Sequence, residues 1–450
     1  MHRAALLLLA LGLQQTKGRC FFNRTQEYCL CYRLTQQSAG SIIQCLAAST
    51  VEFQGGDLEK YADFPIEDLD STIKNLELLE IKKIIFSDLL VPEVLLARVL
   101  QIMFDSCSFV ERGSWALPIT SLHFHNVTVT AVVGHKQDLS PLSCWLGALQ
   151  ELSVTASHLA TLPCAVGRVL GALHSLDLAH NSLGDDSLAP AFCQGAFVQL
   201  QVLSLRHNNL TSYRGVCDGV RLLGKLQHLD LSHNALTTGT PSSSPCQWPV
   251  SLRIFNLSSA GLDEVLTPLP PDLEVLDLSS NHLHMVDISL RSLQALFLSS
   301  NELQAMPAVR GCPALHTLHL NNNLIAELPR DDVLLLEHLR DVAVAGNPFN
   351  CTCTGAGAMQ ALAALGFLGQ GWPQGYVCHT PARYQGMLLR DVPTSVLQCN
   401  PAAVLAPVCT GLALLCVAVA AGLLWVRGAQ PRGLCGLGRQ DDACSTAEHL

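Results

Sequence analysis

Three histidines at regular intervals are the first residues in this sequence whose type and spacing suggest chemistry. His180, His207 and His233 each directly precede an asparagine. If each interval is one turn of a repeating coil, the imidazoles stack along one margin about 4.8 Å apart. Such a row suits a metal ion or a pH-sensitive edge, since imidazole titrates near neutrality. Solvent-facing histidines in a repeated motif explain the same spacing, so we predict no metal site.

No catalytic constellation accompanies these histidines. The sequence contains no phosphate-binding loop, zinc-protease helix, nucleophile elbow or kinase motif. The paired carboxylates Asp185-Asp186 and Asp331-Asp332 lie in turn-like sequence, and we expect Asp177, Asp230 and Asp277 on an exposed strand face. All of these are expected to be solvated, which predicts a protein that is not an enzyme and needs no cofactor.

The histidines belong to a recurring phrase, LxxLxLxxNxL, whose alternate leucines point into a coil and whose asparagine can bond the turning backbone. Isolated amphipathic helices would not hold an asparagine at a fixed offset. These are leucine-rich repeats, which stack into an α/β solenoid, or horseshoe, with a parallel sheet on its concave face. Clear copies begin at Leu173, Leu200, Leu226, Leu273, Leu293 and Leu315, and weaker copies begin at Leu76, Val99, Ile119, Leu149, Leu252 and Leu339.

The twelve copies begin 20 to 30 residues apart and occupy residues 72–346. Irregular lengths predict longer, partly helical loops on the convex side in the first half. Tighter extended turns are expected after Leu252. Within the weak copies, we take Leu76, Leu79, Ile81 and Ile84 as one phrase, and Val99, Ile102, Phe104, Cys107 and Phe109 as the next.

Charge and cysteine usage indicate an exported protein. The net charge of −10 over 450 residues, without a basic cluster, argues against a nucleic-acid partner. Residues 1–18 resemble a secretory signal peptide. Fifteen cysteines between Cys20 and Cys399 then indicate disulfides. Five glycosylation sequons fit the same route, although single sequons arise by chance, and they begin at Asn23, Asn126, Asn209, Asn256 and Asn350.

Cysteine-rich segments flank the repeats and predict a cap at each end. In the amino-terminal cap, residues 19–71, we expect short strands at Ile42-Ile43 and at Val51–Phe53. Within the solenoid, Cys164 with Cys193 and Cys217 with Cys246 span about one repeat each, which suits bridges between coils without fixing the connectivity. Residues 347–400 carry the motif NPFNCTC and resemble the carboxy-terminal cap of many extracellular repeat proteins, which implies Cys351–Cys378 and Cys353–Cys399 pairs around Trp372.

An uncharged run at residues 404–426 is long enough to cross a membrane as a helix. Arginines follow at positions 427, 432 and 439, so orientation rules predict a type I single-pass plasma-membrane protein with an extracellular ectodomain. A glycolipid-anchor signal would end in its apolar tail. Here residues 427–450 are expected to form a short cytoplasmic tail.

Sequence segments that include residues other than the repeat leucines resemble one family. The strings CLCYR, VEFQGGDLE, SLDLAHNSL, GVCDGV, HLDLSHNAL, CQWPVSLRIFNLSSAGLDEV and LEVLDLSSNHL are similar to the myeloid lipopolysaccharide co-receptors, monocyte differentiation antigens of the leucine-rich-repeat class. The resemblance implies Cys20–Cys31 and Cys29–Cys45 disulfides in the amino-terminal cap. This chain departs from the mammalian members, which end in a glycolipid anchor.

The resemblance also implies an apolar amino-terminal pocket for bacterial acyl chains, in which each buried methylene contributes ~0.8 kcal/mol. Some of the lining candidates are equally expected as core, and nearby lysines would meet lipid phosphates or form a solvated strand edge. The candidates are Phe53, Leu58, Tyr61, Phe64, Leu69, Ile73, Leu76, Leu79, Ile81 and Val91, with Lys74, Lys82 and Lys83.

The function that follows is a pattern-recognition co-receptor of innate immunity. It would take lipopolysaccharide or lipopeptides from the lipopolysaccharide transfer protein and deliver them to a Toll-like receptor with its lipid-binding accessory protein. The alternative is a leucine-rich-repeat adhesion receptor that binds a protein on its concave face.

Overall fold

A computed structural model describes residues 19–32, 42–45, 47–57, 81–91, 119–129, 146–237, 246–327, 339–366, 368, 371–395 and 401–428. The chain divides into two compact units, Met1–Arg390 and Asp391–Leu450. The first unit holds the repeats and the described disulfides, and the second holds the apolar helix. Each unit is described by itself.

The first unit is built on a 15-stranded sheet that follows the chain order almost without exception. β1 pairs antiparallel with β2, and every later pair in the sheet is parallel. This confirms the predicted solenoid. The strands are β1 (Arg19–Asn23), β2 (Tyr28–Tyr32), β3 (Thr50–Asp57), β4 (Lys83–Val91), β5 (Ser121–His125), β6 (Thr128–Val129), β7 (Glu151–Thr155), β8 (Ser175–Asp177), β9 (Val202–Ser204), β10 (His228–Asp230), β11 (Ile254–Asn256), β12 (Val275–Asp277), β13 (Ala295–Phe297), β14 (Thr317–His319) and β15 (Asp341–Ala343).

Alternation along each short strand decides which side chains form the core. Leu176, Leu203, Leu229, Leu276 and Leu296 are each fully buried, whereas the residues on either side of them lie on the concave face. Side chains of neighbouring strand positions point to opposite faces. The central leucines of successive repeats are also register partners, so one apolar column runs through the stack.

The asparagines of the phrase form a hydrogen-bonded ladder beneath the sheet. Asn208 donates through Nδ2 to the carbonyls of Leu178 and Leu205, both at 3.0 Å, and its Oδ1 accepts from the backbone N–H of Leu183 at 3.0 Å. It therefore connects two coils. A buried backbone group without a partner is costly, so this repeated bonding stabilises each turn.

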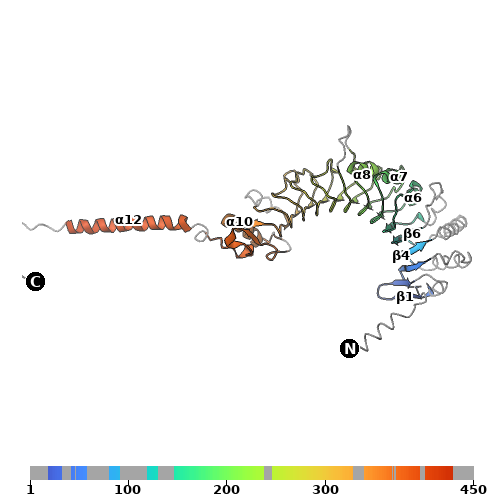
Figure 1. Ribbon diagram of the computed structural model, residues 1–450, viewed down its shortest axis with the longest axis horizontal. Coiled ribbons are helices and arrows are strands. Elements are labelled where there is room, and N and C mark those ends of the chain that lie inside the picture. The colour runs from blue at the N-terminus through green and yellow to red at the C-terminus, as the bar shows by residue number, and fades with distance from the viewer. Residues whose placement is uncertain are drawn as a thin grey trace, which may run out of the picture. The chain divides into compact units, whose positions relative to one another are not determined.

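Among the described connections, helices cover the outer side of the arc in its first half, as the irregular repeat lengths predicted. α6 (Cys164–Val169), α7 (Asp185–Ala191) and α8 (Tyr213–Val220) lie on that side (Figure 1). Within residues 251–327 the connections contain no helix. Successive strands there lie 20 to 22 residues apart, from Leu276 to Leu296 and on to Leu318, which leaves room only for extended turns.

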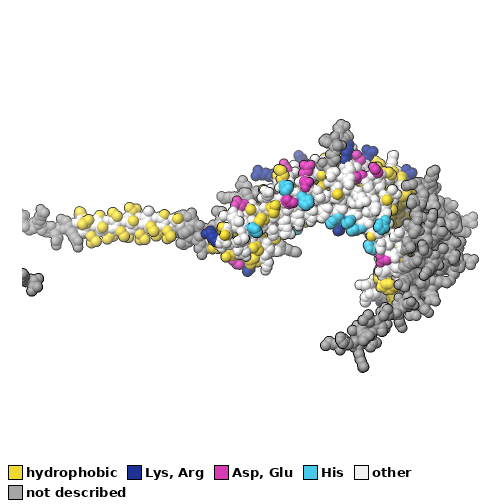
Figure 2. Space-filling model, viewed as in Figure 1, with side chains coloured by type: hydrophobic (Ala, Val, Ile, Leu, Met, Phe, Trp, Pro, Cys, Tyr) yellow, Lys and Arg dark blue, Asp and Glu magenta, His cyan; other side chains and the backbone are white. Residues whose placement is uncertain are grey.

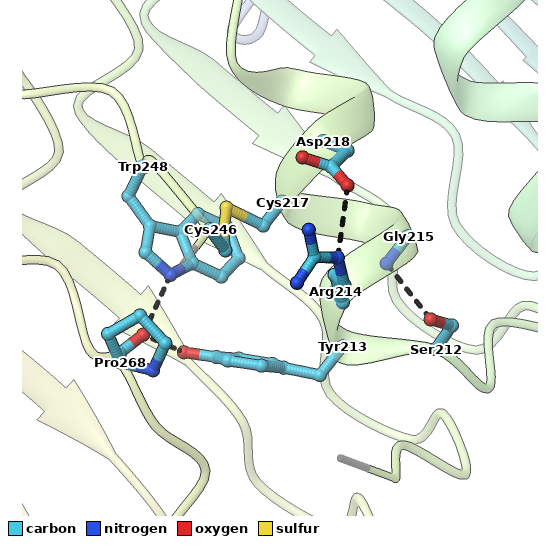
Figure 3. Close-up of a disulfide and its surroundings, with 9 residues drawn as sticks. All are labelled: Ser212, Tyr213, Arg214, Gly215, Cys217, Asp218, Cys246, Trp248 and Pro268. Carbon is cyan, nitrogen blue, oxygen red and sulfur yellow. Dashed lines mark hydrogen bonds and ion pairs between the residues drawn. A yellow bond between two sulfur atoms is a disulfide. The ribbon is translucent and has the colours of Figure 1, made fainter. Parts of the chain in front are cut away.

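The change from helical to extended connections occurs beside the Cys217–Cys246 disulfide (Figure 3). α8 begins at an N-cap in which Ser212 Oγ accepts from the backbone N–H of Gly215 at 2.9 Å. Tyr213 Oη and Trp248 Nε1 then donate to the same carbonyl oxygen, that of Pro268, each at 2.9 Å. The aromatic pair thus ties α8 to the extended connection between β11 and β12.

The structure corrects the repeat phrase that we placed at Leu76, Leu79, Ile81 and Ile84. Residue pairing aligns Val51 of β3 with Ile84 of β4 and with Leu122 of β5. The inward positions of that repeat are therefore Ile84 and Phe86, five residues later than predicted. The leucine spacing fits both the predicted and the observed assignment of inward residues. Hydrogen bonding of β4 to β3 and β5 selects the later one.

Two further expectations at this end need correction. The phrase from Val99 to Phe109 lies outside the described residues, but β4 pairs directly with β5, so the concave sheet has no strand between them. The first repeats are therefore longer than expected, 33 residues from Val51 to Ile84 and 38 from Ile84 to Leu122. Ile42–Cys45 forms a 3-10 helix, η1, instead of a strand, whereas Val51–Phe53 lies in β3 as predicted.

Five of the six disulfides expected from the sequence are formed in the described residues. They are Cys20–Cys31, Cys29–Cys45, Cys164–Cys193, Cys217–Cys246 and Cys351–Cys378. Cys399, the expected partner of Cys353, lies outside the described residues.

The carboxy-terminal end of the first unit packs around an aromatic pair. It contains β16 (Phe349–Asn350), α10 (Cys353–Ala364), β17 (Cys378–Thr380) and the 3-10 helices η4 (Ala382–Tyr384) and η5 (Leu389–Asp391). Phe349 stacks on Tyr376 at 5.9 Å between ring centroids. Trp372, which we expected inside this cap, is half-buried and meets Tyr376 edge-on at 5.1 Å. Tyr376 is the fully buried aromatic.

The second unit contains α12 (Pro401–Gly428). Its segment Leu405–Trp425 is long and apolar enough to cross a membrane, by length and composition. Its described side chains are exposed. This segment lies within the predicted span 404–426.

Candidate functional site

A column of stacked phenylalanines occupies the amino-terminal end of the solenoid. Phe53 of β3, Phe86 of β4 and Phe124 of β5 are register partners at an inward position. The Phe53 and Phe86 ring centroids are 5.4 Å apart with ring planes 19° from parallel, and the Phe86 and Phe124 centroids are 5.4 Å apart at 13°. Elsewhere in the solenoid this position is usually leucine, so the column is a local departure from the repeat.

The phenylalanine side chains of this column are less buried in β4 and β5 than in β3. Phe53 is 3% exposed, whereas Phe86 and Phe124 are only half-buried by the described residues. Phe86 and Leu122 border a core cluster that includes Val51 and the two amino-terminal disulfides. This end of the solenoid therefore offers a partly uncovered aromatic surface, which is the type of wall that takes an apolar ligand.

Of the lining residues predicted from sequence, the structure describes few. Phe53 and Ile81 lie together in the core cluster and are almost fully buried. Val91 ends β4, and nothing is described of its side chain. Leu58, Tyr61, Phe64, Leu69, Ile73, Lys74, Leu76 and Leu79 lie outside the described residues. Their part in a pocket stays a prediction.

The described lysines lie apart from the aromatic column. Lys82 is exposed just before β4, and Lys83 lies on the concave face because Ile84 points inward. Lys83 is the register partner of Ser121, whose Oγ donates to Glu151 Oε2 at 2.9 Å. A ligand phosphate on Lys83 would therefore sit on the opposite side of the sheet from Phe86.

Phe86 and Phe124 are the residues that sequence reasoning missed. A signal was present, because VEF, IIF and LHF each place phenylalanine two residues after the first inward residue. This alignment was missed because the predicted repeat was shifted by five residues at β4, which placed Ile84 at the asparagine position.

The acidic residues expected on the concave face have a local structural role. Asp177, Asp230 and Asp277 each accept through Oδ1 a hydrogen bond from the backbone N–H two residues later, at 3.0, 2.9 and 2.9 Å. These carboxylates stabilise the turn after the strand, as Asx turns do. They are half-buried rather than simply solvated.

The three histidines stack as predicted. Histidine side chains gather on the inner margin of the arc (Figure 2). The ring centroids of His180 and His207 are 4.5 Å apart, and those of His207 and His233 are 5.8 Å apart. Arg206 Nη2 approaches His233 Nε2 at 3.4 Å. In the described part of the chain, the potential metal ligands that converge in a group of three are Cys20, Cys31 and Cys45, all of them in disulfides.

Burial lowers the pKa of three histidines along the concave side. The pKa of His123 is lowered by burial and by Lys83, and that of His228 by burial. The pKa of His180 is lowered by desolvation, then by His207 and Arg206. In each case the folded state holds its proton less tightly than the unfolded chain does.

We therefore expect the solenoid to lose stability as the pH falls from about 7.5 to 5.5, because the unfolded state binds more protons in that window. The loss begins near the unfolded histidine pKa and ends below the lowered folded values. Thermal unfolding followed by circular dichroism measures it. A His123→Gln, His228→Gln double variant should show a shallower decline, and an unchanged slope would contradict the assignment.

Solved structures with low similarity to this chain include the following two. The mouse RP105/MD-1 complex matches with a TM-score of 0.42 and 18% identity, covering 81% of this chain and 73% of that chain. Human 5T4, described as Wnt-activated inhibitory factor 1, matches with a TM-score of 0.43 and 22% identity, covering 54% of this chain and 92% of that chain.

Sequence comparison shows a relationship to receptors. Leucine-rich repeat family profiles match residues 173–190 and 225–248. Toll-like receptor 2 of Mus musculus is 34% identical over 284 residues, which is 63% of this chain and 36% of that protein. Toll-like receptor 2 of Capra hircus is 28% identical over 369 residues, 79% of this chain and 46% of that protein. The chain thus spans less than half the length of these relatives. It is a leucine-rich-repeat protein related to Toll-like receptors.

Proposed function

We propose that this relative of Toll-like receptors is a cell-surface pattern-recognition co-receptor. It binds the acyl chains of bacterial lipopolysaccharide or lipopeptide at the amino-terminal end of its solenoid and delivers them to a Toll-like receptor complex. The observation that carries the proposal is the phenylalanine column, in which Phe86 and Phe124 are half-buried, whereas the inward residues of β8 to β14 are fully buried.

The physical basis of binding is apolar burial. Each acyl methylene removed from water contributes ~0.8 kcal/mol, so a chain of a dozen carbons needs a long apolar wall and little else. Phe86 and Phe124, which continue the stack of the buried Phe53, supply part of such a wall on the sheet. The predicted lining from Leu58 to Leu79 would complete the enclosure.

The rest of the chain supports a role at a membrane. Disulfides in the first unit suit an oxidising extracellular compartment. The apolar helix Leu405–Trp425 would anchor the protein in the plasma membrane. Delivery to a receptor, with lipid supplied by the lipopolysaccharide transfer protein, is the mode of action we propose.

Lipid uptake by cells that display the full chain tests this function. With the transfer protein present, we expect these cells to bind fluorescent lipopolysaccharide, and Tyr61→Asp or Leu79→Asp to reduce binding at least ~10-fold because a buried charge opposes acyl-chain burial. Val250→Asp is the matched control, since Val250 is 73% exposed far along the chain.

Surface expression measured with an antibody to a terminal tag normalises each variant. Binding that is equal in Tyr61→Asp, Leu79→Asp and Val250→Asp cells would reject the amino-terminal pocket. No binding by cells that display the unaltered chain would reject the lipid function itself.

A second function, adhesion through the concave face, has one observation in its favour. Val202 and Ile254 are apolar yet 36% and 37% exposed on that face. An apolar stripe on a concave sheet is a possible docking surface for a protein. A stripe that is free to bind a protein favours the adhesion function, and a stripe that is covered disfavours it.

A further inference from the structure

One glycosylation sequon lies within the concave sheet. Asn256, of the sequon Asn256-Leu257-Ser258, is the last residue of β11. Phe255 and Leu257 are fully buried, so Asn256 projects from the concave face between Asp230 of β10 and Asp277 of β12. The other four sequons begin outside the parallel strands of the concave sheet.

The Asn256 side chain is arranged so that a glycan would break none of its described bonds. Its Oδ1 accepts from the backbone N–H of Ser258 at 2.9 Å, the same turn-stabilising bond that Asp230 and Asp277 make. An N-linked glycan is attached through Nδ2 and leaves Oδ1 free to accept this bond. In Asn23, Asn126 and Asn350 the Nδ2 atom donates to Gln26, Asp88 and Glu327, so a glycan there would have to leave that particular N–H in place.

An apolar stripe, interrupted by His228, runs beside this asparagine. Val202, His228, Ile254 and Val275 are register partners in consecutive strands, in the concave position two residues before the one that Asn256 occupies. Ile254 and Asn256 are two positions apart on one strand, so they point to the same face. Within the described residues, no side chain packs over Val202 or Ile254 enough to bury it.

We propose that an N-linked glycan on Asn256 lies over this stripe and closes the centre of the concave sheet to protein partners. The glycan is attached at the edge of the stripe, and the C–H faces of its sugar rings suit the exposed Val202 and Ile254 side chains. It also needs no second molecule, because the chain itself carries the sequon. The inference depends on passage through the secretory pathway and not on which ligand the protein binds.

The consequence concerns where partners can dock. With the glycan in place, the central strands β9 to β12 no longer present a bare surface. Ligands are then confined to other parts of the first unit, including the amino-terminal end with its phenylalanine column. This weakens the adhesion alternative without relying on any property of a lipid ligand.

Hydroxyl-radical footprinting of the full chain in lipid nanodiscs tests the proposal at the level of single residues. The key variant is Ser258→Ala, which removes the sequon but keeps the Asn256 side chain and its bond to the backbone N–H of residue 258. Asn209→Gln is the matched control, because it removes a sequon at an exposed position outside the concave strands. All forms are made in a eukaryotic secretory host, and glycopeptide mass spectrometry measures occupancy at Asn256.

We expect Asn256 to be occupied in the unaltered chain. Oxidation of Ile254 and Val202 should rise severalfold in Ser258→Ala and remain unchanged in Asn209→Gln. Val250 and Met285, exposed residues outside the concave strands, serve as internal references in every sample. An unmodified Asn256 would overturn the proposal, as would equal oxidation of Ile254 in the two variants. Asn256→Gln provides a second route to the same comparison.

Discussion

Replacing Asn234 by alanine is expected to lower the free energy of unfolding by about 3–5 kcal/mol, because it leaves several buried backbone groups without partners. Asn234 is 3% exposed. Its Nδ2 donates to the carbonyls of Leu205 and Leu231 at 3.0 and 2.9 Å, and its Oδ1 accepts from the N–H groups of Asn208 and Leu210 at 3.1 and 3.2 Å. An alanine side chain replaces none of these bonds.

Guanidinium denaturation followed by circular dichroism measures the effect. Gln294→Ala is the matched control, since it removes an exposed amide from the same kind of repeat and should change stability by less than about 0.5 kcal/mol. If the two variants unfolded at the same denaturant concentration, the asparagine ladder would not be a main source of stability. Loss of the ladder should also loosen two adjacent coils together, because Asn234 bonds to both.

Replacing Trp248 by alanine should lower the free energy of unfolding by about 3–5 kcal/mol, through loss of a large buried ring and the cavity left behind. Trp248 is 7% exposed and meets Tyr213 and Phe255 with ring centroids 5.2 and 5.1 Å apart. These contacts join α8 to β11. We therefore expect protease cleavage to increase around residues 246–250 as well.

Trp248→Phe separates ring packing from the hydrogen bond. It keeps an aromatic ring but removes the donor to the Pro268 carbonyl, which still accepts from Tyr213 at 2.9 Å. Because that oxygen remains bonded, the expected loss is only about 1 kcal/mol. Equal losses in Trp248→Phe and Trp248→Ala would mean that the indole N–H, rather than the ring, carries the stability. Denaturation under the same conditions distinguishes the two.

Stability and the proposed function thus depend on different regions of the solenoid. From β8 onward, buried leucines and bonded asparagines leave little uncovered apolar core. At β3 to β5 the column of Phe53, Phe86 and Phe124 replaces leucine, and burial by the described residues is incomplete. If this end binds lipid as proposed, a site built on a stacked sheet needs no large movement of the sheet to take up or release its ligand.

Part of the candidate site could be predicted from sequence. Phe53 and Ile81 were named, and both lie in the amino-terminal core cluster. Phe86 and Phe124 were missed because the leucine spacing at this end fits two phases, with inward residues at either Leu79 and Ile81 or Ile84 and Phe86. Nothing local distinguishes them. Pairing with β3 on one side and β5 on the other selects the second.

The sequence alone determined the features that depend on local spacing. Alternation of leucines predicted the buried strand positions, the ladder asparagines followed from their offset, and the interval between His180, His207 and His233 predicted their stacking. Only the tertiary structure decided features that depend on which distant segments pair. These include the phase of β4, the phenylalanine column, the backbone bonds of Asp177, Asp230 and Asp277, and the concave setting of Asn256. The physical reason is that a repeat specifies its own turn, whereas hydrogen bonding between turns specifies which residues of different repeats become neighbours.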